Sequence, residues 1–299
     1  MNEYYIIQTA KYDNNRYKKI NYYVSVINDN NNSINIVFGN YKSRPCIEIL
    51  VYNNSPISTL NNVSNDIKCT IMNDFNVNHQ DIILLIKIAL HFTINKYSYI
   101  QQFIFTDNST INCSNNIKIS LSDLSFVKYG KTWYEKYFNA IPDESNIDII
   151  DVQKSIIHNR LNEKITMDSK KFISVNKEFL KKNNINQDKI EKIVKKIKDI
   201  YHENITVYDY LQNFISEHIE CLCYAYIFIY YMNRILYDTA WIIKKENIKS
   251  YEIKYSYLST EKKASHEKII NRIKNFNKNN LPEIITYNYQ KIYKNINYI

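Results

Sequence analysis

Glycine is nearly absent from this chain, with only Gly39 and Gly130 among 299 residues. Loops that hold phosphate groups use glycine because a backbone without a Cβ atom can approach the ligand closely. The dinucleotide-binding pattern G-x-G-x-x-G and the glycine-rich loop of protein kinases therefore cannot occur in their usual forms. This scarcity argues against most nucleotide-binding enzymes, and it predicts that asparagine takes turn positions that glycine usually fills.

Arginine is scarce as well, because it supplies only five of the 39 basic side chains. Lysine, asparagine, isoleucine and tyrosine share AT-rich codons, whereas glycine, proline and many arginine codons are GC-rich. The composition therefore indicates an AT-rich genome. An excess of lysine is consequently weak evidence, by itself, for binding to nucleic acid.

Positive charge is concentrated near the C-terminus. The chain has a net charge of +9, and residues 244–299 carry 12 basic and five acidic side chains, a net charge of +7. Such a segment could bind phosphate groups or an acidic partner, or it could be a solvated lysine face. The candidate contacts are Lys244, Lys245, Lys262, Lys263, Lys268, Arg272, Lys274 and Lys278. Tyrosines that lie between these residues in the sequence could stack on bases.

The five cysteines are odd in number and scattered along a long chain. This distribution predicts no disulfide framework and a reducing compartment. Residues 1–20 carry charges and no apolar core, so no signal peptide is predicted. The uncharged run Cys221–Met232 is shorter than the ~20 residues that a membrane span needs, and it is interpreted as a buried core helix.

The N-terminal half predicts an α+β fold with a mixed or antiparallel sheet and packed helices. Residues 22–27, 34–38 and 47–52 are β-branched and aromatic, and the asparagine-rich run 28–33 predicts a turn between the first two. An apolar helix over 79–90, with Asn78 and Asp81 as capping residues, should be covered on several sides. Strands are expected at 102–106 and 116–121, followed by a helix that begins near Ser122 and Asp123.

The C-terminal half predicts helices. The run Pro142–Asn146 suggests a boundary between an α/β domain over 1–142 and a mainly α-helical domain over 149–299. Isoleucine and valine at 190, 193, 194 and 197 follow helical spacing. Residues 206–246 are interpreted as one long or broken apolar helix, and residues 261–276 as an amphipathic helix.

Two patterns that could carry chemistry are incomplete. Tyr129-Gly130-Lys131-Thr132 matches the end of a Walker A loop, but the first glycine of that loop should fall at position 125, which is serine. His218, Cys221 and Cys223 form H-x-x-C-x-C, yet a helix would turn Cys223 away and no second pair of ligands follows. Core packing is the favoured interpretation of the cysteines, so no catalytic residue, metal site or cofactor is predicted.

Glu217 and Glu220 flank these cysteines. A carboxylate pair is conceivable there, but two acidic residues three positions apart are more typical of a solvent-exposed edge.

The most individual stretch is 124–140, LSFVKYGKTWYEKYFNA. It resembles a YGKTWYEKxF signature of uncharacterised proteins of giant nucleocytoplasmic DNA viruses. That resemblance implies a viral origin and no established activity. In the purely structural interpretation, the aromatic residues pack as one helix face, namely Trp133, Tyr134, Tyr137 and Phe138. The signature residues that could instead make an interaction site are Tyr129, Gly130, Lys131, Thr132, Trp133, Tyr134 and Glu135.

The predicted order of elements also resembles acetyltransferases of the GNAT type, in which antiparallel strands precede a helix, a strand and a helix with a tyrosine-rich turn. Residues 134–138 are similar to the family's final helix. The coenzyme A loop Q/R-x-x-G-x-G/A should lie in 53–80, where no glycine occurs, and Asp81 would repel a pyrophosphate. The resemblance therefore implies a degenerate coenzyme A site.

Three hypotheses follow. The first is a non-enzymatic accessory, binding or scaffold protein of a large DNA virus, located in the host cytoplasm (viral factory) or the virion, with a protein or virion component as partner. The second is association with nucleic acid through residues 244–299. The third is an acetyltransferase-derived enzyme.

Overall fold

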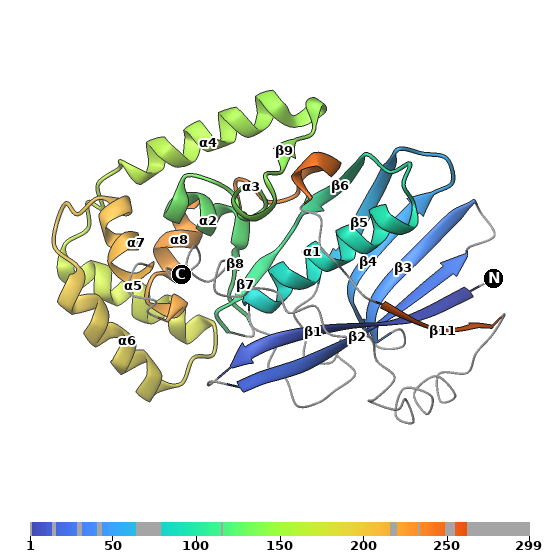
Figure 1. Cartoon of the computed structure of the whole chain (residues 1–299). Coiled ribbons are helices and arrows are strands. Elements are labelled where there is room, and N and C mark those ends of the chain that lie inside the picture. The colour runs from blue at the N-terminus through green and yellow to red at the C-terminus, as the bar shows by residue number, and fades with distance from the viewer. Residues whose placement is uncertain are drawn as a thin grey trace. The chain divides into compact units, whose positions relative to one another are not determined.

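The computed structural model describes residues 2–13, 16–28, 32–40, 44–63, 79–114, 116–215, 220–232, 234–248 and 255–261. Contacts between residues divide the chain into two compact units. Among the described residues, the first unit combines those up to 105 with those from 242 to 261, and the second contains those from 106 to 241. The boundary expected near Pro142 thus falls inside the second unit, and the first unit joins residues 255–261 to the N-terminal strands (Figure 1).

The first unit is built on long antiparallel strands. Strands β1 to β5 form four successive antiparallel pairs, from β1–β2 to β4–β5, and β11 pairs antiparallel with β1. The predicted strands at 22–27, 34–38 and 47–52 are confirmed, because they lie within β2, β3 and β4. The bounds are β1 (Asn2–Asp13), β2 (Arg16–Asn28), β3 (Ser33–Asn40), β4 (Arg44–Tyr52), β5 (Ile57–Val63) and β11 (Tyr255–Glu261).

Helix α1 (His79–Lys96) confirms the strongest helix prediction and continues six residues beyond it. Its apolar residues from Ile82 to Ile94 are buried nearly all round, as expected. Phe92 places its ring edge-on against Phe38 of β3 and Tyr5 of β1. The helix therefore covers the strands of this unit; the expected capping residues Asn78 and the Asp81 side chain lie outside the described part.

Strand β6 (Gln102–Asp107) confirms the strand expected at 102–106 and runs parallel to β5. The two strands pair over only three positions, from Ile57 opposite Gln102 to Thr59 opposite Ile104. A register shift between Glu48 and Ile49, where β4 pairs with β5, disturbs β5 just after this stretch. The full strand order is β11-β1-β2-β3-β4-β5-β6-β10-β9, where β9 is Ile141–Pro142 and β10 is Thr239–Lys244.

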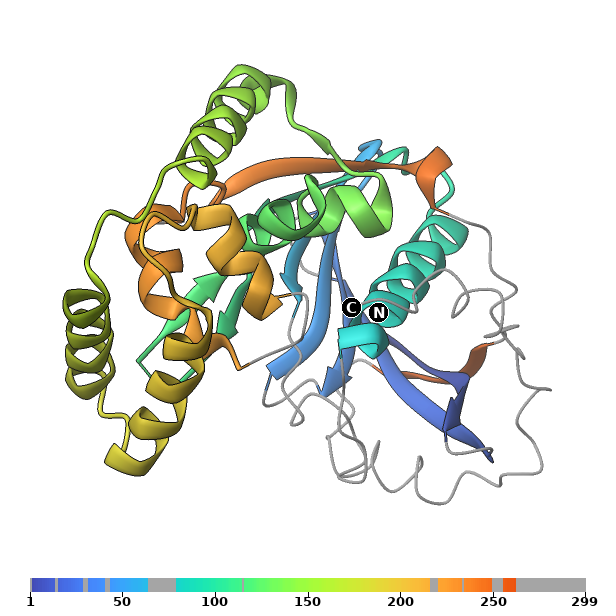
Figure 2. The same ribbon diagram turned by 90° about the vertical axis from the view of Figure 1, so that its left-hand side faces the viewer.

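The second unit begins with a hairpin and continues through helices, and α5 packs beside α6 (Figure 2). Strand β8 lies within the strand predicted at 116–121, and Ile190, Ile193, Val194 and Ile197 are buried on α6 as predicted. The bounds are β7 (Thr110–Asn112), β8 (Lys118–Ser120), α2 (Leu121–Tyr129), α3 (Trp133–Phe138), η2 (Glu144–Asn146), α4 (Ile147–Leu161), α5 (Ser169–Lys182), α6 (Gln187–Ile200), α7 (Val207–Ile215), η3 (Cys221–Cys223) and α8 (Ala225–Met232).

The expected helix over 206–246 is correct only as far as Met232, where α8 ends. Arg234 and Asp238 then adopt positive φ angles of 53° and 65°, which no helix accommodates. The chain next forms β10, followed by the short 3₁₀ helix η4 (Lys245–Asn247). Because β10 and β11 are strands, the described residues do not confirm the mainly helical domain expected over 149–299. Residues 262–276 of the expected amphipathic helix lie outside the described part.

Asparagine does replace glycine at left-handed positions. Five of the seven described residues with positive φ other than glycine are asparagine. Asn can adopt this conformation at lower cost than most residues, because its short side chain bonds to the nearby backbone. The residues are Asn32, Asn54, Asn139, Asn184 and Asn204, of which the first lies in the predicted turn at 28–33.

The uncharged run 221–232 forms η3 and α8, and most of its side chains are buried, as expected of a core helix. Among the described residues, no helix has the length and apolar character needed to cross a membrane.

Candidate functional site

The signature begins with a helix that glycine terminates. Helix α2 starts at its cap Ser120, whose hydroxyl accepts the Asp123 N–H, and ends at Gly130 with a φ of 67°. The Gly130 N–H donates to the Phe126 carbonyl at 2.8 Å, which closes the last turn. A Cβ atom on Gly130 would meet nothing within 4 Å. Gly130 therefore ends the helix through its backbone angle rather than through a close contact.

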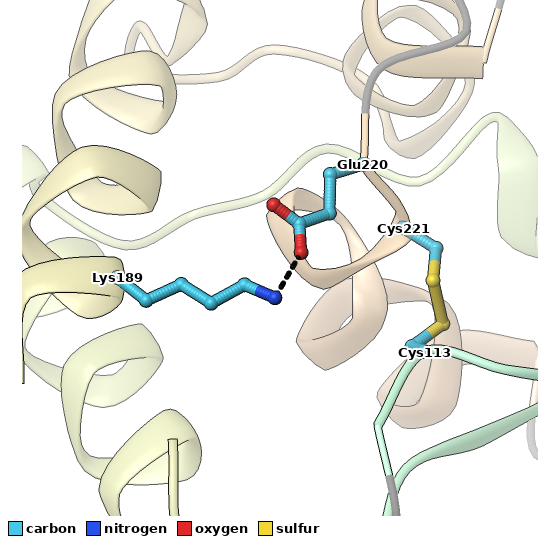
Figure 3. Close-up of a disulfide and its surroundings, with 4 residues drawn as sticks. All are labelled: Cys113, Lys189, Glu220 and Cys221. Carbon is cyan, nitrogen blue, oxygen red and sulfur yellow. Dashed lines mark ion pairs between the residues drawn. A yellow bond between two sulfur atoms is a disulfide. The ribbon is translucent and has the colours of Figure 1, made fainter. Parts of the chain in front are cut away.

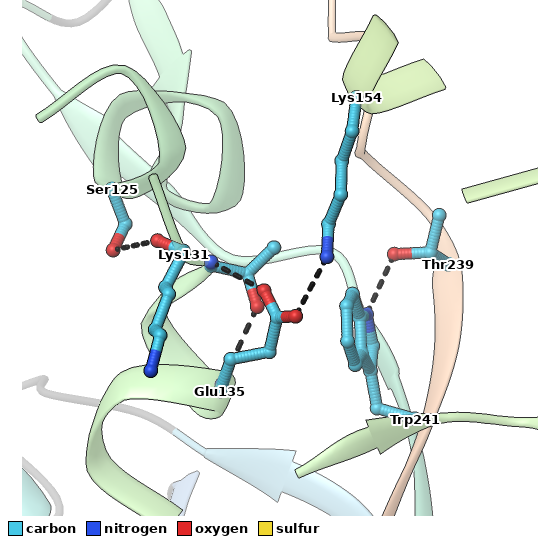
Figure 4. A network of polar contacts seen from close by, with 7 residues as sticks. Ser125, Lys131, Glu135, Lys154, Thr239 and Trp241 are labelled. Atoms are coloured by element: carbon cyan, nitrogen blue, oxygen red, sulfur yellow. Dashed lines mark hydrogen bonds and ion pairs between the residues drawn. The ribbon is translucent and has the colours of Figure 1, made fainter. Parts of the chain in front are cut away.

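The next signature residues form a capping box for α3. The Glu135 carboxylate accepts the Thr132 N–H at 2.7 Å, and the Thr132 hydroxyl accepts the Glu135 N–H at 3.4 Å (Figure 4). Ser125 of α2 donates its hydroxyl to the Lys131 carbonyl at 2.9 Å. These bonds satisfy the free amides at the helix start and hold the turn closed.

Glu135 also reaches beyond its own helix. Its second carboxylate oxygen pairs with the Lys154 ammonium of α4 at 2.7 Å (Figure 4). That ammonium lies 5.7 Å from the ring centre of buried Trp241, whose indole N–H donates to the Thr239 hydroxyl at 2.7 Å. Glu135 therefore serves as a helix cap and as the anchor of α4, and each of its carboxylate oxygens already has a partner within the chain.

The aromatic residues of α3 pack against each other, as the purely structural interpretation of the signature predicted. The Trp133 ring centre lies 4.8 Å from that of Tyr134, 5.4 Å from Tyr137 and 5.6 Å from Phe138. Burial, and to a smaller extent the negative charge of Asp107, raises the pKa of the Tyr134 hydroxyl well above its ordinary value. Trp133 and Tyr134 are thus core residues, because they are only 4% and 5% exposed.

Two lysines that the sequence did not single out surround Tyr129. The Lys136 ammonium lies 3.0 Å from the Tyr129 ring centre and 5.1 Å from that of Tyr137. The Lys128 ammonium lies 5.4 Å from the Tyr129 ring and donates to the Ile215 carbonyl at 3.4 Å. Burial lowers the pKa of both amines, and with the charge of Lys128 nearby it brings that of Lys136 to about 8. Lys131, which the sequence did single out, is exposed.

A buried acidic pair lies beneath the start of α2. Asp107 accepts the Ser109 N–H at 3.1 Å and the hydroxyl of Ser122. Asp123 accepts the Leu236 N–H at 2.6 Å through one oxygen, and its other oxygen is buried without a hydrogen-bond partner among the described residues. Burial raises the pKa of Asp107, and burial together with the charge of Asp107 raises that of Asp123 to about 6. In the sequence, Asp123 indicates only the start of a helix.

Cysteine chemistry differs from the expectation. Cys113 at the end of β7 and Cys221 of η3 form a disulfide, with Cα atoms 5.6 Å apart (Figure 3). Cys46 is disulfide-bonded too, whereas Cys223 is a buried thiol. The prediction that no disulfides form is therefore wrong for Cys46, Cys113 and Cys221. The pairing of Cys113 with Cys221 spans 108 positions, so the local sequence gives no signal of it.

The residues that precede these cysteines do not form a catalytic or metal site in the described part. Glu220 pairs with Lys189 of α6 at 2.6 Å (Figure 3), which fits a solvent-exposed edge better than a catalytic carboxylate pair. His218 and Glu217 lie outside the described residues. Within the described part, no three histidine, cysteine or acidic residues form a group that could hold a metal ion.

The basic segment is only partly described. Lys244 is exposed, whereas Lys245 donates its ammonium to the Ser98 carbonyl at 2.8 Å and its backbone N–H to Gln101. Lys245 therefore serves the fold of the first unit. The remaining candidates lie outside the described residues, namely Lys262, Lys263, Lys268, Arg272, Lys274 and Lys278.

Helix α4 combines a buried face with an apolar exposed face. Ile150 and Ile157 are fully buried, and Leu161 continues that face. On the other side, Ile149 is 53% exposed and Val152 is 60% exposed. The exposed apolar residues of the helix and the strand before it are Ile141, Ile147, Ile149, Val152 and Ile156.

Comparison of the chain with protein-family models, curated proteins and solved structures finds no match in any of the three. Function therefore has to be argued from the chemistry and exposure of these residues.

Proposed function

We propose that this chain is a non-enzymatic accessory protein that binds a partner protein through the outer face of α4. One observation carries the proposal. Of the eight large hydrophobic side chains that are exposed in the described part, five lie between Ile141 and Ile156. Single exposed apolar residues are common on protein surfaces, but a contiguous group is typical of a protein–protein contact.

The spacing of these residues favours a helix as the partner. Ile149, Val152 and Ile156 follow an i, i+3, i+7 pattern, so they form one stripe along the helix. Their opposite face is fixed in place by Ile150, Ile157 and the Lys154–Glu135 ion pair. A rigid apolar stripe of about two turns is what an amphipathic helix binds with its own apolar face.

Charge on α4 indicates the chemistry of that partner. Asp148 and Asp151 are exposed beside the stripe, and exposed Glu144 precedes the helix. A partner helix that carries lysine or arginine beside its apolar residues would complement these carboxylates. We therefore expect a basic amphipathic helix on a partner protein.

We also propose that the chain is built on a degenerate GNAT-type fold and comes from a large DNA virus, where it acts in the host cytoplasm (viral factory) or in the virion. Antiparallel strands precede α1, and the parallel pair β5–β6 associates over only three positions, which fits the splayed central strands of that family. The signature helix α3 follows. Residues 53–80 contain no glycine, which argues against a working coenzyme A loop.

Fluorescence anisotropy with synthetic helical peptides tests the docking proposal. Two labelled peptides would share a leucine stripe and differ in their flanking residues, which are lysine in one and glutamate in the other. The wild-type chain should prefer the lysine peptide, and Val152→Glu should weaken its binding at least tenfold. Tyr208→Glu is the matched control, because Tyr208 is a 45% exposed apolar residue on α7, and it should change affinity less than twofold. Equal losses in both variants would contradict the proposal.

The alternative functions have their own readouts. A clear rise in the unfolding temperature when coenzyme A or ATP is added would count against the non-enzymatic assignment. Salt-sensitive binding of DNA or RNA that disappears when residues 262–299, which follow β11, are removed would favour the nucleic-acid alternative instead.

A further inference from the structure

The lysines around Tyr129 form a charged group without a counter-charge. The Lys136 and Lys128 ammonium groups lie 3.0 Å and 5.4 Å from the ring centre of Tyr129, and the charge of Lys128 contributes to lowering the pKa of Lys136. Neither has a carboxylate partner within 4.0 Å among the described residues, where the ion pairs involve other lysines. Glu135, next to Lys136 in the chain, is already engaged by Lys154 and by the cap of α3.

This arrangement costs free energy as it stands. Two like charges that are partly removed from water repel each other, and the face of one tyrosine ring offsets only part of that cost. The Tyr129 hydroxyl is itself buried without a hydrogen-bond partner among the described residues. An anion between the two ammonium groups would remove the repulsion and supply the missing negative charge.

We propose that Lys128, Lys136 and Tyr129 form a binding site for a phosphate group. A phosphate monoester carries nearly two negative charges and several acceptor oxygens, so it can pair with both ammonium groups at once, whereas a carboxylate carries one charge. The site lies at the junction of α2 and α3, on the signature segment itself. It does not depend on the docking face of α4.

Binding at this site should take up a proton. Without ligand the pKa of Lys136 is about 8, and a bound dianion would raise it towards its ordinary value of 10.5. The tyrosine hydroxyls at the site stay protonated over this range, because burial raises the pKa of Tyr137 to about 12 and raises that of Tyr129 as well. Burial also lowers the pKa of the Lys128 ammonium, so a bound dianion favours the protonated form of both lysines.

The test uses glycerol phosphate as the probe and isothermal titration calorimetry on the full chain. Because only the protonated Lys136 binds well, affinity should fall about tenfold between pH 7.5 and pH 9. Buffers with different ionisation enthalpies should show proton uptake on binding near pH 8.5. Constant affinity over this range, or absence of binding at millimolar probe, would overturn the proposal. These measurements require only the wild-type chain.

Variants locate the site. Lys136→Met should weaken binding at least tenfold, and Lys128→Met should give a loss of similar size. Lys131→Met is the matched control, because it removes the same charge from the exposed turn between the two helices, and it should change affinity less than twofold. Equal losses in the control and the test variants would indicate general surface charge and would refute the site.

A short thymidine oligonucleotide distinguishes the sources of the phosphate group. If it competes with glycerol phosphate and its binding is lost in Lys136→Met, the ligand is a nucleic-acid backbone. If it does not compete, the ligand is a small phosphate ester. Either result keeps the site, since both depend on the same two lysines.

Discussion

The signature segment and helix α4 lie in the same unit and use their side chains in opposite ways. In the signature, Thr132 and Glu135 complete a helix cap, and Trp133 and Tyr134 are buried in the core. In α4, Val152 remains 60% exposed. The comparison teaches that the most recognisable stretch of this sequence chiefly builds structure, whereas an ordinary-looking helix presents the surface available to a partner.

The sharpest test of this contrast replaces one large side chain in each region. Trp133→Ala should lower the free energy of unfolding by about 3–5 kcal/mol, because it removes a buried indole and leaves a cavity among three aromatic rings. Urea denaturation monitored by circular dichroism measures the change. A loss below about 1 kcal/mol would mean that Trp133 is not a core residue.

The buried acidic pair adds a dependence on pH. The pKa of Asp123 is about 6 in the folded chain, against 3.8 in an exposed carboxyl, so its contribution to stability is full below pH 4 and is lost as pH rises through 6. A difference of about 2 in pKa corresponds to ~3 kcal/mol at most. Asp123→Asn keeps an oxygen for the Leu236 N–H and cannot ionise. The wild type should therefore lose stability relative to this variant between pH 4 and pH 7.

Urea titrations of both proteins at several pH values measure that difference. Subtracting the variant from the wild type cancels the titration of carboxyls that do not interact with Asp123, such as Glu3, whose pKa is lowered by its hydrogen bonds to Lys96 and Tyr5. A difference that stays flat across this range would show that Asp123 does not titrate as the burial implies.

A backbone test at Gly130 should give a smaller effect. Gly130→Ala should cost about 1–2 kcal/mol, because φ is 67° there and the cost is torsional, since no atom blocks the methyl group. Gly130→Asn should cost less, since asparagine already takes this conformation at five described positions. Thermal unfolding of the two variants gives the order, and an equal cost for both would contradict the torsional explanation.

The smallest change in stability is expected on α4. Val152→Ala should alter the free energy of unfolding by less than about 0.5 kcal/mol, because the side chain is largely exposed already. The same urea experiment applies. A loss of 2 kcal/mol or more would show that Val152 packs inside the chain and would remove the basis for the docking face.

The prediction of elements from the sequence succeeded where the local signal was strong. The strands β2, β3 and β4 have β-branched and aromatic runs separated by turn residues, and α1 has a long apolar pattern. It failed at β10, because Trp241, Ile242 and Ile243 read as a continuation of the apolar run before them. An apolar run of this length can be buried as a helix or as a strand, and only its neighbours β6 and β9 decide.

The residues of the candidate site also fall into those that the local sequence identified and those that it did not. The sequence identified Gly130, Thr132 and Glu135, whose roles are local and follow from turn and capping rules. It did not identify Lys128, Lys136 or the acidic pair as a group. Their chemistry depends on burial and on neighbours that come from other elements, such as the Leu236 backbone and Asp107 beside Asp123.

The sequence by itself determined where the chain turns, which residues replace glycine and which helices have an apolar face, because these properties depend on torsion angles and on spacing along a few residues. Only the tertiary structure decided that Cys113 bonds to Cys221, that Asp123 is buried beside Asp107 and that one face of α4 stays uncovered. The physical reason is that burial, desolvation and pairing depend on which distant segments meet, and spacing along the chain does not specify that.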